Sequence, residues 1–346
     1  MLSKMNKLII SLLAVIAIIL ALTVVISKKH EEMGFKIVFR SARDAPMDDP
    51  DFKQNPQKYF ELYIMNPDGS NVQRITYNRF LEAQPDVSPD GKRIVFSIHL
   101  SPGRVKETDP GWEIAVMDID GRNLRILTNN SWMDFGAHWN HDGTKIVFVS
   151  DSAHRTAEDI EKGVLPRYDI YVMNADGSGL KQLTFAKPGE INADPSFSFE
   201  EPERILYIHS EGLSGYFDIY MMDVDGENKK LVLRHDEKLL AIHDPMFSPD
   251  GSEIIFSGKV RELDAGEPIN NIFILNSEGK LRRITEDDGE SDVLPQFSPD
   301  GKMICYFTYV WEDGGRTHRI RVANADGSNE KILSDYPWEA DPTWVP

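Results

Sequence analysis

Hydrophobic and polar residues alternate in short runs along most of the chain after residue 34. The run "EIIFS" (253–257) follows the turn sequence "SPDGS", and the run "DIYVMN" (169–174) precedes "ADGSG". β-Branched and aromatic residues in such runs, separated by Asp-Gly pairs, predict strands joined by tight hairpin turns, because Asp and Gly tolerate a positive φ. The pattern therefore predicts an all-β fold built from hairpins.

Two hairpin motifs alternate along the chain. The first, "SPDGKRIVFS" (88–97), returns as "SPDGSEIIFS" (248–257) and "SPDGKMICYF" (298–307). The second reads "IYVMNADGSGLKQLT" (170–184). Its turn acids lie 48 to 56 residues apart, at Asp68, Asp120, Asp176, Asp225, Glu278 and Asp326. Six such units with four strands each predict a six-bladed β-propeller with antiparallel blades.

The ends of the repeat region predict how the ring of blades closes. The C-terminal "EADPTWVP" (339–346) matches the first strand of a blade, and "GFKIVFRS" (34–41) matches a second strand. We therefore expect the C-terminal strand to complete the N-terminal blade. Two turns depart from the motif: blade three has "WNHDG" (139–143), and blade four has a longer acidic turn in "SFSFEEPERILYI" (196–208).

The first 32 residues form a separate segment. Residues 8–26 contain no charge, Gly or Pro, and this length is close to the ~20 residues that cross a bilayer as a helix. We expect residues 1–32 to be a signal or anchor segment and residues 33–346 to be the propeller. The long apolar run favours an uncleaved single-pass anchor with an extracytoplasmic propeller. Cleavage would instead give a secreted or periplasmic protein.

The motifs "DPxFSPDGxxIxF" and "IYxMNxDGxxxxxLT" give the chain a family resemblance. From about residue 35 to residue 346 it resembles the TolB-like propellers, a bacterial family. The resemblance to TolB implies a periplasmic protein that has an α/β domain before its propeller. Here only a few residues separate the apolar segment from the first blade, so we expect a TolB-like propeller without that domain.

Composition limits the function classes. The formal net charge is −18, which argues against nucleic acid or anionic lipid as the main partner. The single cysteine, Cys305, excludes a disulfide within the chain and is expected to be buried. Serine-hydrolase, zinc-protease and nucleotide-binding motifs are not found in the sequence, so no catalytic residue is predicted.

Loop length predicts a binding face. The long connections, between second and third strands and between blades, should emerge on one face, which we call the long-loop face. They include residues 43–58, 99–111, 151–167, 259–269 and 309–318. Trp132, Trp311 and Trp338 are candidate anchors there, with Tyr77, Phe80, Phe135 and Tyr336. The alternative is tolerated surface variation, with part of these aromatic residues packing the loops.

The innermost strands of the six blades have a proline at the same position in all but one blade. We call this position the proline column: Pro85, Ala137, Pro195, Pro245, Pro295 and Pro342. Acidic residues recur at two positions before it. Three residues earlier stand Glu82, Asp134, Asn192, Ile242, Asp292 and Glu339, which we expect to ring the channel mouth. Directly before the column stand Asp194, Asp244 and Asp341, which could bind Ca²⁺ with His138 or His243 nearby. Alternatively, these carboxylates cap backbone N–H groups between blades.

Together these patterns favour a membrane-anchored, extracytoplasmic propeller that binds envelope proteins through its long-loop face. One alternative is a hydrolase or lyase acting on a carbohydrate or glycoconjugate at the channel mouth. Another is a sensor that binds a small ligand in the channel. No cofactor beyond the possible calcium ion is predicted.

Overall fold

The computed structural model describes residues 34–45, 48, 52, 56–78, 80–100, 111–130, 132–153, 167–199, 201–212, 215–263, 266–286, 289–312, 315–334 and 336–346. Lys36–Pro346 form one compact unit. The predicted apolar helix, residues 8–26, lies outside the described residues. Within the ranges given above, no helix is both long and apolar enough to span a bilayer.

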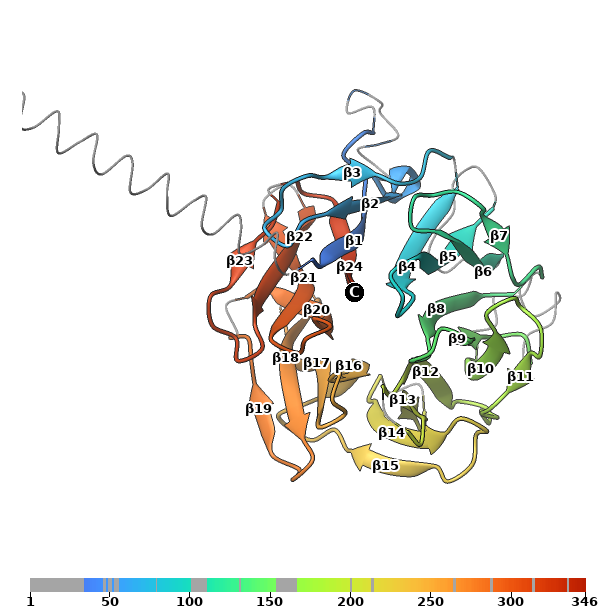
Figure 1. The fold of residues 1–346 in the computed structure, drawn as a ribbon. Coiled ribbons are helices and arrows are strands. Elements are labelled where there is room, and N and C mark those ends of the chain that lie inside the picture. The colour runs from blue at the N-terminus through green and yellow to red at the C-terminus, as the bar shows by residue number, and fades with distance from the viewer. Residues whose placement is uncertain are drawn as a thin grey trace, which may run out of the picture. The chain divides into compact units, whose positions relative to one another are not determined.

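Six four-stranded sheets are arranged around a central axis (Figure 1). All neighbouring strands within a sheet are antiparallel, and the prediction of an all-β, six-bladed propeller is confirmed. Blade 1 takes strands from both ends of the unit, in the order β24-β1-β2-β3. Its strands are β24 (Glu339–Val345), β1 (Lys36–Ser41), β2 (Glu61–Met65) and β3 (Gln73–Arg74), with the short helix η1 (Pro56–Tyr59) before β2.

The other five blades follow in chain order. Blade 2 contains β4 (Leu81–Val87), β5 (Arg93–His99), β6 (Trp112–Asp118) and β7 (Arg125–Ile126); blade 3 contains β8 (Asp134–Trp139), β9 (Lys145–Ser150), β10 (Asp169–Asn174) and β11 (Lys181–Gln182). Blade 4 contains β12 (Ile191–Phe197), β13 (Arg204–Ser210), β14 (Asp218–Asp223) and β15 (Lys230–Leu233). Blade 5 contains β16 (Ala241–Phe247), β17 (Glu253–Glu262), β18 (Pro268–Asn276) and β19 (Leu281–Arg283); blade 6 contains β20 (Ser291–Phe297), β21 (Met303–Glu312), β22 (Gly315–Asn324) and β23 (Lys331–Ile332).

The Ser-Pro-Asp-Gly turn holds itself together. In blade 2 the Ser88 hydroxyl donates to Asp90 Oδ1 at 2.7 Å and accepts from the Arg93 backbone N–H at 3.0 Å. Gly91 has a φ of 69°, which a glycine adopts without steric cost. The same serine contacts occur in blades 5 and 6. The ten-residue repeat therefore marks one self-contained turn between the first and second strands of a blade.

Each second strand carries one aromatic residue into the core. These are Phe39, Phe96, Phe148, Tyr207, Phe256 and Tyr306, and all are 3% exposed or less. They pack with aliphatic residues of adjacent blades, as Phe96 of blade 2 does in one core cluster with Leu62 and Ile75 of blade 1. Removing one such ring would cost about 3–5 kcal/mol of folding free energy. Cys305, as predicted, is fully buried.

A recurring glycine brings adjacent blades into backbone contact. Gly327 of blade 6 has a φ of 87°, and a Cβ added to it would lie 2.7 Å from the Ile284 carbonyl oxygen of blade 5. Gly69, Gly121, Gly177 and Gly226 approach the preceding blade in the same way. Only glycine fits such an approach. We call the contact region between two adjacent blades a seam.

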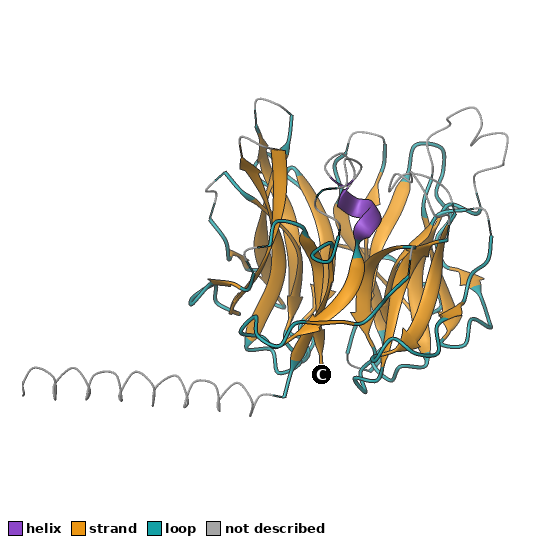
Figure 2. Cartoon of the chain, turned by 90° about the horizontal axis from the view of Figure 1, so that it is seen from above, coloured by secondary structure: helices purple, strands orange, loops and turns teal. Residues whose placement is uncertain are grey.

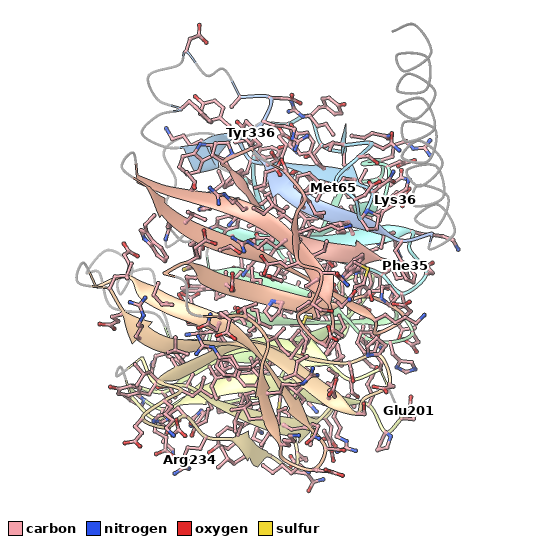
Figure 3. The ribbon with its side chains drawn as sticks, turned by 90° about the vertical axis from the view of Figure 1, so that its left-hand side faces the viewer. Phe35, Lys36, Met65, Glu201, Arg234 and Tyr336 are labelled. Atoms are coloured by element: carbon pink, nitrogen blue, oxygen red, sulfur yellow. The ribbon has the colours of Figure 1, made fainter. Side chains whose placement is uncertain are left out.

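The two faces of the propeller can be told apart by the elements that lie on them (Figure 2). The short helix η1 lies on the long-loop face, and the C-terminus lies on the opposite face, which we call the short-turn face. Lys36 and Glu201 likewise lie on the side opposite to Tyr336 and Arg234 (Figure 3).

Two predicted loops are mostly strand. Residues 259–269 and 309–318 were expected as long connections, but β17 runs to Glu262 and β21 runs to Glu312. Cross-strand pairing continues almost to the tip, where Glu312 pairs with Gly315. Trp311 therefore lies in β21 and not in a loop, because alternating residues let the hairpin continue past the body of the blade.

Candidate functional site

The innermost strand of every blade has a β-bulge at the same place. In β4, for example, the pairing with β5 skips from Ala83 to Asp86. The residue before the proline column has a φ between 48° and 62° in all six blades: Gln84, Gly136, Asp194, Asp244, Leu294 and Asp341. A left-handed residue breaks the alternation of side chains. All six residues line the central channel.

Side chains of this ring bond to the backbone of the next blade. Asp341 Oδ2 accepts from the Gln84 N–H at 2.9 Å, Asp194 Oδ2 accepts from the Asp244 N–H at 3.2 Å, and Asp244 Oδ2 accepts from the Leu294 N–H at 3.3 Å. Gln84 Oε1 accepts from the Gly136 N–H at 3.1 Å. The three aspartates thus cap amides between blades, as the alternative to calcium binding predicted.

Asp341 also contacts a buried cation, the Arg40 guanidinium. Its Oδ2 lies 2.8 Å from Nε of Arg40, and both side chains are less than 10% exposed. The Arg40 guanidinium lies 4.8 Å from the centre of the Phe60 ring. A charged pair with this little water around it is costly to break from one side.

Burial perturbs the titration of the channel residues. Burial, with the nearby charges of Asp194 and Asp341, raises the pKa of Asp244 to about 7, although the Ser257 hydroxyl and the Leu294 N–H oppose the shift. Burial also lowers the pKa of His243, whose Nδ1 lies 3.9 Å from Asp194 Oδ2. A carboxyl group that titrates near neutral pH can exchange a proton at physiological pH.

His138 behaves in the opposite way. Burial opposes its charge, but the carboxylates of Asp86, Asp244 and Asp194 together raise its pKa. Asp86 is the nearest of these groups, with Oδ2 3.5 Å from His138 Nδ1. The channel therefore holds an imidazole with a raised pKa beside aspartates.

Within the part of the chain that the structure describes, no group of three or more His, Cys, Asp or Glu side chains is placed to hold a metal ion. Calcium binding by Asp194, Asp244 and Asp341 stays a prediction.

The channel widens on both sides of the bulge ring. The ring encloses a middle cavity of about 50 Å³, enough for a few water molecules. The middle cavity shares the lining residues Gln84, Leu294 and Asp341 with a second cavity of about 310 Å³, which we call the mouth cavity. It also shares His138 and Gln296 with a lower cavity of about 230 Å³, which is bounded by turn residues such as Pro89 and Pro249. The three cavities follow one another along the channel.

Five of the eleven residues that line the mouth cavity are aromatic. They are Trp112 from blade 2, Phe135 and Tyr168 from blade 3, and Phe307 and Tyr309 from blade 6. The Phe135 and Tyr168 rings meet edge to face at 5.2 Å. The Arg40–Asp341 pair also lines this cavity. The arrangement is an aromatic cup with a charged pair, which suits an apolar group that also carries a polar end.

The prediction that Glu82, Asp134, Asp292 and Glu339 ring the channel mouth is wrong. Their exposed fractions are 0, 1, 5 and 0%, respectively. Glu82 accepts from Thr76 Oγ1 at 2.5 Å and from the Leu62 N–H at 3.2 Å, both in blade 1. A strand projects its side chains from the two faces of its sheet, and in a propeller those faces meet the neighbouring blades.

The other three acids are also held within the protein. Asp134 accepts from Asn130 Nδ2 at 2.7 Å, and Asp292 accepts from Thr308 Oγ1 at 2.7 Å. Glu339 accepts from the Ser41 hydroxyl at 3.2 Å and pairs with Arg43. Burial raises the pKa of Asp134 and that of Glu339, and it raises the pKa of Glu82 to about 7.

The three candidate tryptophans are half-buried and occupy different surroundings. Trp338 packs against Phe52 and Phe60. Trp311 lies 6.5 Å from the Tyr309 ring, which places it beside the mouth cavity. The Trp132 backbone N–H donates to Asn130 Oδ1 at 2.7 Å. The structure thus does not gather the three into one cluster.

Sequence reasoning found Phe135 but missed Trp112, Tyr168, Phe307 and Tyr309, which complete the cup. Trp112 and Phe307 lie on strands outside the predicted long connections, whereas Tyr309 begins the predicted connection 309–318, which is mostly strand. For Trp112 and Tyr168, the position directly after a long connection, at or next to the start of a strand, is the signal that could have revealed them.

Comparisons with known proteins agree with this fold. No family model matches the chain. The Tol-Pal system protein TolB of Francisella tularensis subsp. mediasiatica is 26% identical over 302 residues, which are 84% of this chain and 60% of that protein. The crystal structure of TolB from Acinetobacter baumannii has a TM-score of 0.61 at 17% identity and covers 90% of this chain and 66% of that one. An oligogalacturonate lyase from Vibrio parahaemolyticus has a TM-score of 0.50 at 14% identity, with 79% of this chain and 70% of that one covered.

Six four-stranded blades around one channel define the class of protein, a six-bladed β-propeller. In sequence and in fold the chain is similar to TolB-like propellers. The chain spans 60% of the length of the curated relative. The lyase structure is similar in fold alone.

Proposed function

We propose that this chain is a protein-binding propeller of the cell envelope, held at the membrane by the predicted helix at residues 8–26. Its long-loop face would receive the partner. The curated relative is named as a protein of the Tol-Pal system, and an envelope role is the function that this similarity supports best. We further propose that the pairing of β24 with β1 closes the ring and keeps the binding face rigid.

The observation that carries the proposal is the aromatic cup of the mouth cavity. Its volume of about 310 Å³ lies at the lower end of the usual range for binding pockets, about 300–1,000 Å³. Large aromatic side chains dominate the energetics of protein interfaces because they bury much apolar area at a small entropy cost. A partner would insert an apolar side chain among Phe135, Tyr168 and Tyr309.

The test is a pull-down from envelope extracts with the tagged full chain. Phe135→Ala and Tyr309→Ala in the cup are compared with Phe199→Ala. Phe199 is 43% exposed and lines the lower cavity at the opposite end of the channel, so it is a matched control. We expect both cup variants to lose a partner that the control retains. Equal recovery with all three variants, at unchanged melting temperature, would reject the proposal.

A second candidate function rests on Asp244. A carboxyl group whose pKa is about 7 could act as a proton donor or acceptor in the channel, as a lyase or hydrolase requires. Similarity in fold to an oligogalacturonate lyase makes oligogalacturonate the first substrate to assay. Turnover that disappears in Asp244→Asn would favour the enzyme. No turnover by the wild-type chain would remove this candidate.

A further inference from the structure

The seam between blades 4 and 5 lacks the close glycine contact found at the other five. Gly279 of blade 5 occupies the position of Gly327, yet a Cβ added to Gly279 would have no atom within 4 Å. At this seam a cleft of about 400 Å³ separates β15 from the turn between β18 and β19. Val232 and Gly279, which correspond to the two contacting residues of the closed seams, both line it.

A local difference in sequence accompanies this opening. Five blades carry a left-handed residue two positions after the turn glycine: Asn71, Asn123, Gly179, Asn228 and Asn329. Blade 5 reads "NSEGKLRRIT" and lacks that residue, and its outer strand starts two residues after the turn glycine instead of four. Blade 4 contributes the longest outermost strand, β15, with 4 residues. The cleft therefore results from departures in two adjacent blades.

The floor of the cleft is apolar. Met221, Phe247 and Leu275 are each less than 10% exposed and belong to the core cluster between these blades. Leu231, at the rim, is 41% exposed. An apolar side chain that entered the cleft would cover these groups and gain about 25 cal/mol per Å² of buried apolar area.

Two acids, Glu201 and Glu253, and two bases, Arg204 and Lys230, line the cleft. Glu253 Oε1 lies 3.5 Å from Arg282 Nη2, and Glu201 Oε1 lies 3.7 Å from His141 Nε2, so each acid has a basic neighbour. Arg204 and Lys230 also line the cleft, and no carboxylate within salt-bridge distance of either is found among the residues with described placement. Two cations thus face a cleft in a chain whose net charge is −18.

We propose that this cleft is a second binding site, separate from the aromatic cup, for an acidic extended segment of a partner protein. An apolar side chain of the segment would rest on Met221, Phe247 and Leu275. Flanking carboxylates would pair with Arg204 and Lys230, because charge-assisted hydrogen bonds are the strongest contacts available there. This site does not depend on the function proposed for the cup.

Phage-displayed random dodecapeptides, selected on the full chain, test the proposal. Phage that also bind the Ser277→Trp variant are removed from the pool. This substitution fills the cleft from an exposed position on its rim. We expect the recovered peptides to place an apolar residue between Asp or Glu residues. A synthetic peptide of the recovered sequence is then titrated by fluorescence anisotropy.

Charge reversal tests the cationic contacts. We expect Lys230→Glu and Arg204→Glu each to weaken binding of that peptide about tenfold or more, which is about 1.4 kcal/mol. Lys181→Glu is the matched control, because Lys181 has the same place in blade 3 as Lys230 has in blade 4. Lys181 of β11 pairs with Val172 of β10, and Lys230 of β15 pairs with Met221 of β14. The proposal is overturned if no peptide distinguishes the wild type from Ser277→Trp, if the peptides are basic, or if Lys181→Glu weakens binding as much as Lys230→Glu.

Discussion

The Gln84 backbone N–H of blade 2 donates a hydrogen bond to Asp341 Oδ2 of blade 1 at 2.9 Å, across 257 positions of sequence. The same oxygen lies 2.8 Å from Arg40 Nε. One carboxylate thus joins three segments of the chain: the C-terminal strand, the N-terminal strand and the next blade. Removing this carboxylate should lower the free energy of unfolding.

Asp341→Asn should lower the free energy of unfolding by about 3 kcal/mol, because it leaves the buried Arg40 without its charged partner. Asn tolerates the left-handed backbone of position 341, so the backbone is not the cause. Urea denaturation measures the change. Asp194→Asn is the control, since its amide oxygen can still accept from the Asp244 N–H. Equal losses in the two variants would contradict the importance of the Arg40 pair.

The closed seams can be tested with a pair of glycines. Gly327→Ala should destabilise the protein more than Gly279→Ala, because only the former places a Cβ against the preceding blade. The φ values, 87° and 79°, are similar, so backbone strain is nearly equal and the difference reports the seam. We expect a lower melting temperature for Gly327→Ala by several degrees. Identical melting temperatures would show that the seam relaxes without cost.

Local contacts could be predicted from the sequence, whereas some contacts between blades could not. The turn around Ser88 and Asp90 is local, and the motif predicted it. The repeat also gave the register of Asp194, Asp244 and Asp341, and with it their role in capping amides. Glu82 was misplaced because its partners, Thr76 and Leu62, belong to another blade.

Contacts between blades depend on three-dimensional proximity that a repeat pattern does not encode. The two irregular turns illustrate this. His141 of "WNHDG" lies with its Nδ1 2.8 Å from Glu203 Oε1 of the acidic turn in blade 4, so the two departures from the motif compensate each other. The irregular sequence of each turn is explained only when the other turn is considered with it. Arg40 and Trp112 were likewise missed because their shared cavity joins blades distant in the chain.

Asp244 predicts a dependence of stability on pH. Its pKa in the folded protein is about 7, above the ordinary value of 3.8, so the folded state binds the proton more tightly than the unfolded state. Its contribution is therefore full below about pH 4 and is lost as the pH rises to about 7. Asp244→Asn removes this loss.

Differential scanning calorimetry at pH 5 and pH 8 measures the effect. The melting temperature of the variant relative to the wild type should be higher at pH 8 than at pH 5. Glu82, with a pKa of about 7, is present in both proteins, so its contribution cancels in the comparison. A difference that does not change with pH would mean that Asp244 titrates normally in the folded protein.

The proposed closure of the ring by β24 gives a further prediction. Deleting residues 340–346 removes most of β24 and leaves the β1 edge of blade 1 unpaired. Exposed strand edges promote association between chains. We expect the deletion variant to aggregate or to melt at a much lower temperature, as size-exclusion chromatography and calorimetry would show. A monomeric variant with an unchanged melting temperature would contradict closure by this strand.

Crosslinking in cells tests partner binding at the aromatic cup most directly. A photo-crosslinking phenylalanine analogue replaces Phe135 in the cup or, as the control, Phe199 at the opposite end of the channel. Illumination should join a specific envelope protein to the chain from position 135 and not from position 199. No adduct from position 135, or the same adduct from both positions, would contradict a partner-binding role for the cup.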